Sequence, residues 1–115
     1  MIAEGQTVLF RFPQTDQQEG KLRPALIIRK VPGQYEDWLL CMISSRLDQE
    51  VPGFDDLLNP SDPDFEKSGL RVPSLLRIGR LAVVNKGILA GRLGEIDEAR
   101  LLRIKARLSY WLQGE

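Results

Sequence analysis

The chain has 115 residues, 43% of them hydrophobic, and its 16 basic and 16 acidic side chains give a formal net charge of zero. This length suits one compact domain with a real core, so we expect a single domain over residues 1–115 and no second one. Histidine is absent and Cys41 is the only cysteine, which excludes a histidine-based zinc site, a thiolate metal cluster and an intramolecular disulfide.

The apolar residues and the charges narrow the class of protein further. The longest apolar run, from Trp38 to Ile43, has six residues, whereas a helix that spans a bilayer needs about 20. Without a signal-peptide pattern either, the chain is expected to be soluble and cytoplasmic, with no membrane contact. Residues 1–66 hold 6 basic and 12 acidic side chains, and residues 67–115 hold 10 and 4. This bipolar pattern argues against a protein that binds duplexes through one broad basic face.

Two predicted β-strands flank a polar loop at the start of the chain. Thr7–Phe12 is rich in β-forming residues, and Pro13 stops it. Residues 13–21 are polar and predict a long loop. The second strand, from Leu22 to about Lys30, begins where Pro24 fixes its own φ and holds the residue before it in an extended conformation.

Arg23 is that preceding residue, and the apolar run after it anchors it at the mouth of a buried strand. A turn at residues 31–34 leads to a third strand, from about Tyr35 to Ser45, in which Cys41 is expected to be a buried, inert thiol. If these two strands pair antiparallel across the short turn, Arg23 and Ser44 are neighbours. An alternative interpretation of the same pattern needs no functional site: Arg23 merely pairs with a nearby carboxylate.

An acidic segment follows the third strand. Residues 47–66 carry three prolines and are expected to be mostly loop, with one short helical turn at about Asp55–Leu58. Seven acidic side chains lie from Asp48 to Glu66 with no basic residue among them. Such a run either repels nucleic acid or covers a basic surface when no partner is present.

Further strands and a helix are predicted after the acidic segment. The expected segments are strands at Leu70–Arg77 and Leu81–Val84, a turn at residues 85–87 and a short glycine-interrupted stretch at Ile88–Gly94. Asp97–Leu112 begins with a candidate N-cap and has the apolar periodicity of an amphipathic helix that packs on the sheet. The apolar stripe is Leu101, Ile104, Leu108 and Trp111, and the polar positions include Arg100, Arg103, Lys105 and Arg107. Together these elements predict an α+β fold.

In the order and spacing of three segments, the chain resembles the MazF/PemK family, the toxin components of type II toxin-antitoxin systems. The segments are Lys21–Ile28, Leu40–Ser45 and Gly69–Arg77, after the first strand and before the C-terminal helix. The resemblance covers nearly the whole chain. It implies an α+β fold, a small SH3-like antiparallel β-barrel with a C-terminal α-helix, assembled as a homodimer. It also implies an endoribonuclease that needs no metal or other cofactor, cleaves single-stranded RNA and is inhibited by a cognate antitoxin protein.

Carried over onto this sequence, the arginine of the family's Arg-Pro pair is Arg23 and the hydroxyl of its third-strand motif is Ser44, so the resemblance implies that both are catalytic. Some members add a supporting arginine and, two positions later, an acidic residue. Arg77 matches the first, but Gly79 stands at the second, and a histidine that some members use in the first loop has no counterpart. A second interpretation therefore stays open, a weak or inactive barrel that binds an antitoxin peptide or RNA as an interaction module.

The chemistry of metal-free RNA cleavage suggests roles for further residues. Attack by a 2′-hydroxyl on the adjacent phosphorus needs a base, an acid and a group that stabilises charge. Arg23 suits the last role, because a fixed guanidinium offers paired donors to phosphate oxygens, and Ser44 can donate to the same phosphate. The other candidates are Ser45 as a weaker donor that strand alternation turns away, Asp16 or Glu19 as the base, and Lys21 and Arg46 as contacts to the RNA backbone.

Two further expectations concern surfaces. Exposed strand edges and the apolar segment Val72–Leu76 predict a homodimer, since a small lone barrel would cover them poorly. The acidic run is expected to flank the RNA site and to move or to select against duplexes when RNA binds. Replacing its members Asp55, Asp56, Asp62 and Asp64 by Asn should then strengthen RNA binding.

Overall fold

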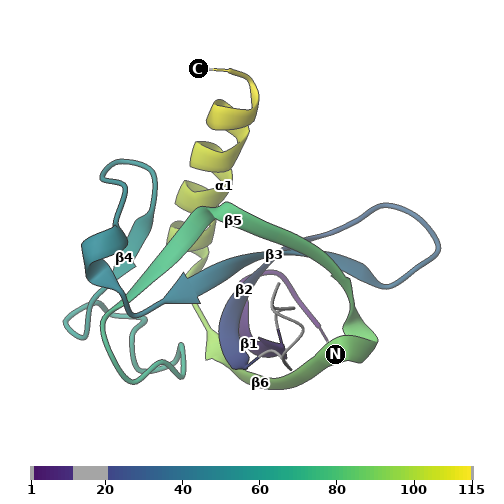
Figure 1. Ribbon diagram of the computed structural model, residues 1–115, viewed down its shortest axis with the longest axis horizontal. Helices are drawn as coiled ribbons and strands as arrows, with labels where there is room; N and C mark the ends of the chain where they lie inside the picture. Colours follow the sequence, from purple (N-terminus) through teal and green to yellow (C-terminus); the bar gives the residue numbers. More distant parts are fainter. Residues whose placement is uncertain (1, 12–20, 115) are drawn as a thin grey trace.

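The computed structural model describes residues 2–11 and 21–114, and Figure 1 shows a strongly curved sheet with one helix beside it. The strands are β1 (Gln6–Arg11), β2 (Leu22–Lys30), β3 (Asp37–Ser44), β4 (Asp56–Leu58), β5 (Ser74–Asn85) and β6 (Leu89–Glu95). Two 3-10 turns, η1 (Leu47–Gln49) and η2 (Lys86–Ile88), and the helix α1 (Glu98–Leu112) complete the order. No helix in the described ranges is long and apolar enough to cross a bilayer.

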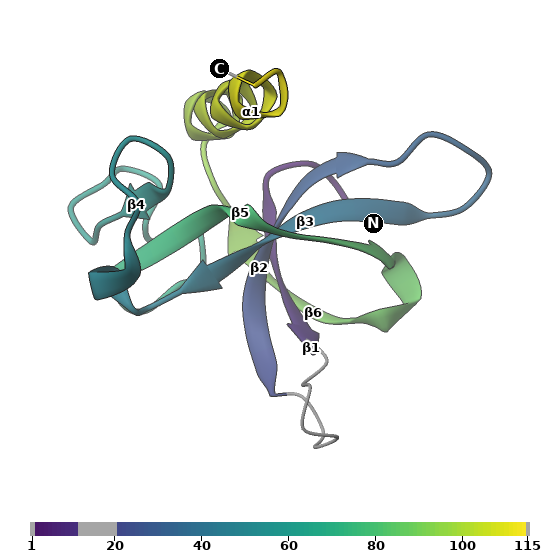
Figure 2. The same cartoon turned by 45° about the horizontal axis from the view of Figure 1, so that its top comes forward.

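The strands form one sheet in the order β4-β5-β3-β2-β1-β6, and every neighbouring pair is antiparallel. The sheet curls until its strands form a ring in projection (Figure 1), and the β2–β3 hairpin reaches away from the centre (Figure 2). The edge strands β4 and β6 do not pair with each other within residues 2–11 and 21–114. The predicted α+β fold, an SH3-like antiparallel sheet with a C-terminal helix, is confirmed, but hydrogen bonds do not close the barrel.

Two elements differ from those predicted. The sequence predicts a helical turn at Asp55–Leu58, whereas three of these residues form β4, because pairing with β5 and the full burial of Leu58 decide the conformation. The sequence also predicts two strands where the structure has the single strand β5. Where β3 pairs with β5, Met42 lies opposite Arg77, and the preceding residue, Cys41, lies opposite Leu81. Residues 78–80 therefore form a bulge in β5, at the place where the sequence predicts a break between two strands.

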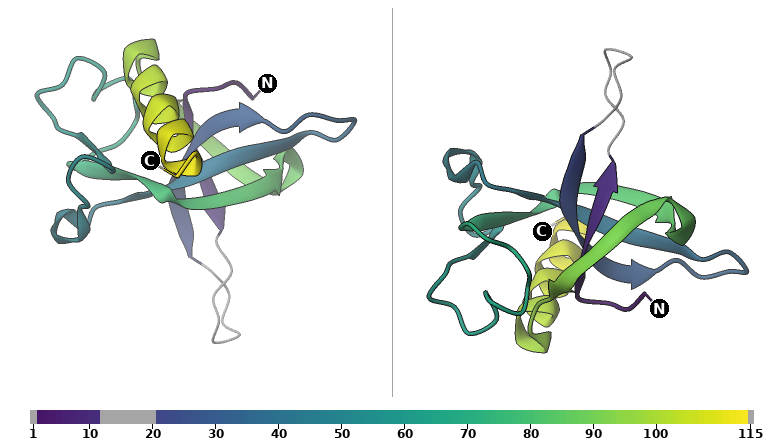
Figure 3. Two further views of the ribbon diagram at one scale, coloured as in Figure 1. Left: turned by 90° about the horizontal axis from the view of Figure 1, so that it is seen from above. Right: turned by 90° about the horizontal axis from the view of Figure 1, so that it is seen from below.

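The helix α1 lies across one face of the sheet (Figure 3). Its residues Leu101, Ile104 and Leu108 are buried in one apolar cluster with residues of β2, β3 and β5. Full burial of each such side chain contributes about 1.5–3 kcal/mol relative to exposure. The predicted stripe is correct at these three positions but not at Trp111, which is exposed and meets the ring of Phe54 edge-on, with centroids 5.3 Å apart.

The other face of β1–β3 carries a second apolar cluster, formed around Val8, Ile27 and Leu40. Cys41 belongs to the first cluster, and its complete burial raises the pKa of the thiol to about 12. The prediction that the Cys41 thiol is buried is confirmed. Because β2 and β3 are buried on both faces, their backbone is rigid, and it holds the residues at the strand ends in place.

Arg100 joins the helix to the acidic segment. The sequence places it on the polar face of the helix, but it is buried. Its guanidinium donates to Asp56 at 2.7 Å, to Asp62 at 3.0 Å and to Asp64 at 2.8 Å. Burial opposes the charged form of Asp64, but the hydrogen bonds from Arg100 and from the N–H of Asp97 outweigh it and hold the pKa of Asp64 below its usual value.

Asp56 also accepts hydrogen bonds from Arg103 at 2.8 Å and from Arg107 at 3.1 Å. The acidic segment therefore covers a basic surface, the second of the two roles that its charge allows. These contacts hold the segment against α1, and the expectation that Asn substitutions there strengthen RNA binding stays a prediction. Removing these carboxylates would leave a buried guanidinium without its partners, which destabilises the fold.

Candidate functional site

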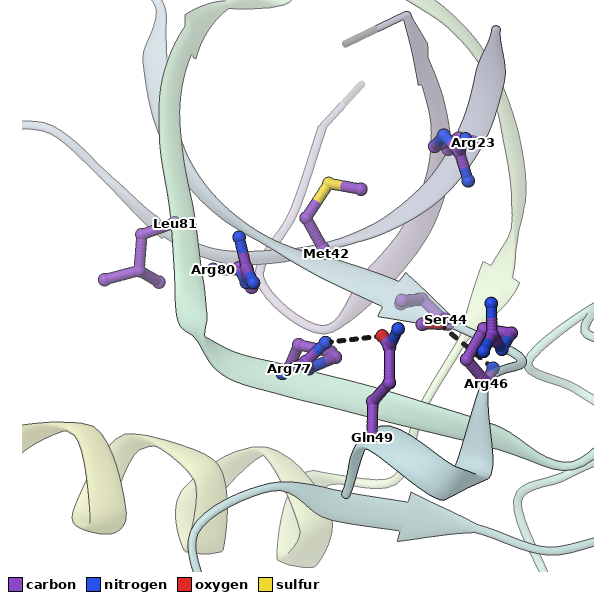
Figure 4. Close-up of a pocket in the computed structure, with 9 residues that line it drawn as sticks. Arg23, Met42, Ser44, Arg46, Gln49, Arg77, Arg80 and Leu81 are labelled. Atoms are coloured by element: carbon purple, nitrogen blue, oxygen red, sulfur yellow. Dashed lines mark hydrogen bonds between the residues drawn. The ribbon is translucent and has the colours of Figure 1, made fainter. Parts of the chain in front are cut away.

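Two adjoining hollows lie where β2 begins and β3 ends. Ala25 is opposite Met42 in the ladder, and the same register continued by two residues places Arg23 opposite Ser44. Both side chains line a first hollow of about 510 Å³ and a second of about 600 Å³. Figure 4 shows the first hollow, with these two residues on neighbouring strands. The structure therefore brings together the two residues that the sequence predicts to be neighbours.

The first hollow takes its side chains from β2, β3, β5 and the turn η1. They are Arg23, Met42, Ile43, Ser44, Arg46, Gln49, Arg77, Arg80 and Leu81. The second hollow shares four of these residues and adds others, four of them from the segment that leads into β5. The added residues are Leu22, Pro24, Ser45, Gly69, Leu70, Arg71, Val72, Ser74 and Leu93.

Arg23 reaches both hollows from a rigid base. Its side chain is exposed, but Pro24 is half-buried and Ala25 is fully buried, so the strand holds the guanidinium at the edge of the core. Within residues 2–11 and 21–114 it has no hydrogen-bond or ion-pair partner. The carboxylate that would explain Arg23 as a purely structural residue is not found in these ranges, and the guanidinium donors can bind a phosphate.

The Ser44 hydroxyl accepts a hydrogen bond from the N–H of Arg46, with 3.1 Å between the two atoms. Because this bond uses an acceptor position, the hydroxyl hydrogen is left to donate to a ligand. The Arg46 side chain pairs with Asp48 through hydrogen bonds of 3.2 and 3.1 Å, and both side chains are exposed. Exposed pairs of this kind are weak, so a phosphate group of a ligand can replace Asp48 as the partner of Arg46.

Arg77, the predicted supporting residue, is held in place on the floor of the first hollow. Its Nη1 donates to Oε1 of Gln49 at 3.0 Å, and its Nε lies 3.6 Å from Oδ2 of Asp55. Asp55 is buried and also accepts a hydrogen bond from the N–H of Val51 at 2.9 Å. Arg77 therefore has one hydrogen bond and one longer ion pair within the described residues, and its buried Nε makes no hydrogen bond.

Arg80 is a site residue that sequence analysis missed. It is exposed, and Figure 4 shows it across Met42 from Arg23. The bulge at residues 78–80 turns it toward the hollow, as bulges do next to functional sites. A Cβ at Gly79 would lie 3.1 Å from the ring of Phe54, so the position that is acidic in some family members has no room here unless the ring moves. A glycine between two arginines in a long strand was the signal that could have revealed the bulge.

The remaining candidates fall in different places. Ser45 lines the second hollow, although strand alternation predicts the opposite face, because β3 ends at Ser44 and the chain bends there. Lys21 is exposed and lines neither hollow. Asp16 and Glu19, the candidate bases, lie outside the described residues.

The two hollows are strongly cationic. Among the described residues five arginines and no carboxylate line them; the arginines are Arg23, Arg46, Arg71, Arg77 and Arg80. Arg71, like Arg80, was not singled out in the sequence. Guanidinium groups beside serine hydroxyls suit the binding of phosphodiesters. In residues 2–11 and 21–114, no group of three or more histidine, cysteine, aspartate or glutamate side chains could hold a metal ion.

Comparisons with known proteins assign the chain to a family. A family model described as PemK-like, MazF-like toxin of type II toxin-antitoxin system matches residues 3–112. Among curated protein sequences, none matches the chain.

Two solved structures share the fold. One is an endoribonuclease in complex with its cognate antitoxin from Mycobacterial species, with a TM-score of 0.66 and 17% identity over 98% of this chain and 96% of that chain. The other is the Mycobacterium tuberculosis toxin MazF-mt6, with a TM-score of 0.61 and 15% identity over 92% of this chain and 96% of that chain. Identities this low support the likeness of fold alone.

Proposed function

The chain belongs to the PemK-like, MazF-like toxins of type II toxin-antitoxin systems, and we propose that it is an endoribonuclease that cleaves single-stranded RNA without a metal. The observation that carries this proposal is the pair of hollows that meet at Arg23 and Ser44, lined by five arginines and by no carboxylate of the described residues. Such a surface attracts RNA phosphates and holds them through charge-assisted hydrogen bonds.

In the proposed reaction two side chains act on one phosphate. The 2′-oxygen attacks the adjacent phosphorus, the bond from phosphorus to the 5′-oxygen breaks, and the products are a 2′,3′-cyclic phosphate and a 5′-hydroxyl. Arg23 binds a non-bridging oxygen whose negative charge grows in the transition state. Ser44 donates its hydroxyl hydrogen to the same phosphate. The 2′-hydroxyl must also lose a proton and the 5′-oxygen must gain one, and Asp16 or Glu19 remains the proposed base.

A cognate antitoxin is the proposed protein partner, because one similar structure is of an endoribonuclease in complex with its cognate antitoxin. We also propose a homodimer, but the structure changes the reason for expecting one. Leu75 and Leu76 of the apolar segment are buried within one chain, although Val72 is half exposed. The edge strands β4 and β6 are therefore the stronger reason to expect assembly, apart from the end of β6, where the N–H of Glu95 already bonds to the carbonyl oxygen of Lys67.

One observation favours a second candidate function. Neither hollow offers a carboxylate from the described residues, and Gly79 lacks the acidic side chain that some family members have. A toxin fold without a base would bind RNA or an antitoxin peptide and leave RNA intact.

A cleavage assay in EDTA distinguishes the two functions. Mixed-sequence single-stranded RNA should yield fragments with 2′,3′-cyclic phosphate and 5′-hydroxyl ends, and Arg23→Ala should yield far fewer. Arg29→Ala is the matched control, because Arg29 is exposed and lines neither hollow. RNA that stays intact with the unsubstituted protein but binds it would support the binding module instead.

A further inference from the structure

The two hollows are parts of one surface. They share Arg23, Ser44 and Arg46, so the residues proposed to act on the cleaved phosphate lie where the hollows meet. Arg80 lines only the first hollow, and Arg71 lines only the second. A strand of RNA that occupies both hollows therefore meets Arg80 on one side of Arg23 and Arg71 on the other.

The five arginines differ in whether their donors are already used. Arg46 and Arg77 have partners within the chain, as described above. Arg23, Arg71 and Arg80 are exposed, and their side chains have no hydrogen-bond or ion-pair partner in the ranges 2–11 and 21–114. An exposed guanidinium in this state binds a phosphate without giving up an existing contact. Of these three arginines, Arg23 thus lies where the hollows meet, Arg80 lies in the first hollow and Arg71 lies in the second.

The bulge in β5 determines where Arg80 lies. Residues 78–80 are the extra residues of the bulge in β5, and Ile78 among them is fully buried, which anchors the bulge in the core. The ring of Phe54 packs against the backbone at Gly79. The position of Arg80 is therefore set by the fold rather than by a free loop.

Arg71 is presented by a segment held at both sides. Before it, Gly69 has a φ of +74° and packs so closely on β6 that a Cβ would lie 2.4 Å from the carbonyl oxygen of Leu93. After it, the Ser74 hydroxyl donates to the carbonyl oxygen of Val72 at 2.8 Å. The guanidinium is exposed, but the backbone that carries it is fixed.

The cationic surface ends beyond Arg71. A third hollow of about 830 Å³ continues from the second there, but Asp62 and Glu66 help to line it. Its other arginine, Arg92, pairs with Glu95 at 3.4 Å. Carboxylates at this point oppose a further phosphate, so Arg71 marks the end of the cationic surface on this side.

We propose that Arg80 and Arg71 bind the phosphates on either side of the phosphate held by Arg23 and Ser44. This inference rests on the proposed function and deepens it, because it defines the substrate class. The site takes an extended single strand through three successive phosphates, and therefore at least a tetranucleotide. Dinucleotides and cyclic nucleotides are poor ligands, since they leave one or both of the outer arginines unused.

Binding of RNA analogues that cannot be cleaved tests the proposal. Randomised 2′-fluoro oligonucleotides, from dinucleotide to octanucleotide, lack the attacking hydroxyl, and fluorescence anisotropy gives their affinity over a range of salt concentrations. Affinity should rise from the dinucleotide to the tetranucleotide. For single strands each neutralised phosphate contributes about 0.7 to the slope of log affinity against log salt. With the octanucleotide, Arg71→Ala and Arg80→Ala should each flatten the slope by about 0.7, and the double variant by about 1.4.

Arg29→Ala is again the control and should leave the slope unchanged. The proposal is overturned if neither substitution changes the slope, if Arg29→Ala changes it equally, or if the affinity of the unsubstituted protein stops rising at the dinucleotide. Circular dichroism of each variant confirms folding, which exposed side chains should not disturb. If the slopes behave as expected but no RNA is ever cleaved, the endoribonuclease proposal fails while the three-phosphate surface stands, so the two failures are distinguishable.

Discussion

Arginines have opposite roles in two regions of the molecule. On α1, Arg100 is buried against three aspartates of the acidic segment, and Arg103 and Arg107 share one of them. In the two hollows, Arg23 and the outer arginines face solvent without a described partner. The acidic segment thus neutralises the arginines of the helix, whereas in the hollows it pairs with Arg46 through Asp48 and with Arg77 through Asp55 and leaves the other three described arginines without a partner. Whether an arginine is structural or free to bind a ligand is decided by which surface the carboxylates cover.

Removing the most buried arginine should produce the largest loss of stability. Arg100→Ala leaves the buried Asp64 without its guanidinium partner, although Asp56 keeps Arg103 and Arg107, and breaking a buried pair in this way costs about 3–5 kcal/mol. Urea unfolding measures this loss. Arg103→Ala is the control, because that side chain is 45% exposed, and its loss should be much smaller. Equal losses would contradict the assignment of Arg100 as the centre of the network.

The same region should weaken in acid. A carboxyl whose pKa is lowered by folding, as that of Asp64 is, stabilises the protein above its unfolded pKa of about 3.9 and stops doing so as the pH falls through the folded value. The difference in free energy of unfolding between the unsubstituted protein and Asp64→Asn should therefore narrow as the pH is lowered from neutral to below that range. A difference that stays constant would show that Asp64 is not held in its charged form.

The fold was predictable from periodicity and turn residues, whereas the division of the arginines was not. The sequence predicts that Arg23 and Ser44 are close because a short turn joins two apolar strands. The exact register also depends on an irregularity between Ile27 and Arg29, which the sequence does not reveal. The sequence gives no sign that Arg100 is buried, because the spacing of Arg100 along the helix puts this residue among the polar ones. Its partners come from a segment 36 to 44 residues away in the chain, and no local pattern encodes that contact.

Arg80 and Arg71 were missed for a related reason. A bulge is a property of two strands together, since it appears only where the register of β3 against β5 shifts between Cys41 and Met42. Residues 70–77 were predicted as strand, but β5 begins at Ser74, and Arg71 is exposed beside a hollow instead of lying in a ladder. Tertiary pairing therefore selects which arginines face the site.

Smaller effects are expected at the centre of the hollows when a neutral donor is lost. Ser44→Ala removes one hydrogen bond to the phosphate and should lower kcat by about tenfold, the value of a typical single bond. If Ser44 and Arg23 hold the same phosphate, the double alanine variant should lose less than the product of the two single effects. Cleavage rates of the three variants at saturating RNA give the comparison. Independent effects that multiply would place the two groups on different phosphates.

If Arg23 serves the cleavage chemistry while the arginines of α1 serve the fold, a single protein sample can show both effects. Cleavage and thermal unfolding are measured on the same preparation of Arg23→Ala. We predict that kcat falls by about a hundredfold or more, as expected for a lost contact to a developing charge, while the melting temperature stays the same. Arg23→Lys should restore only part of the rate, because an ammonium lacks the planar fork. A folded Arg23→Ala protein that cleaves RNA at the full rate, or one whose activity falls only with its melting temperature, would contradict the account.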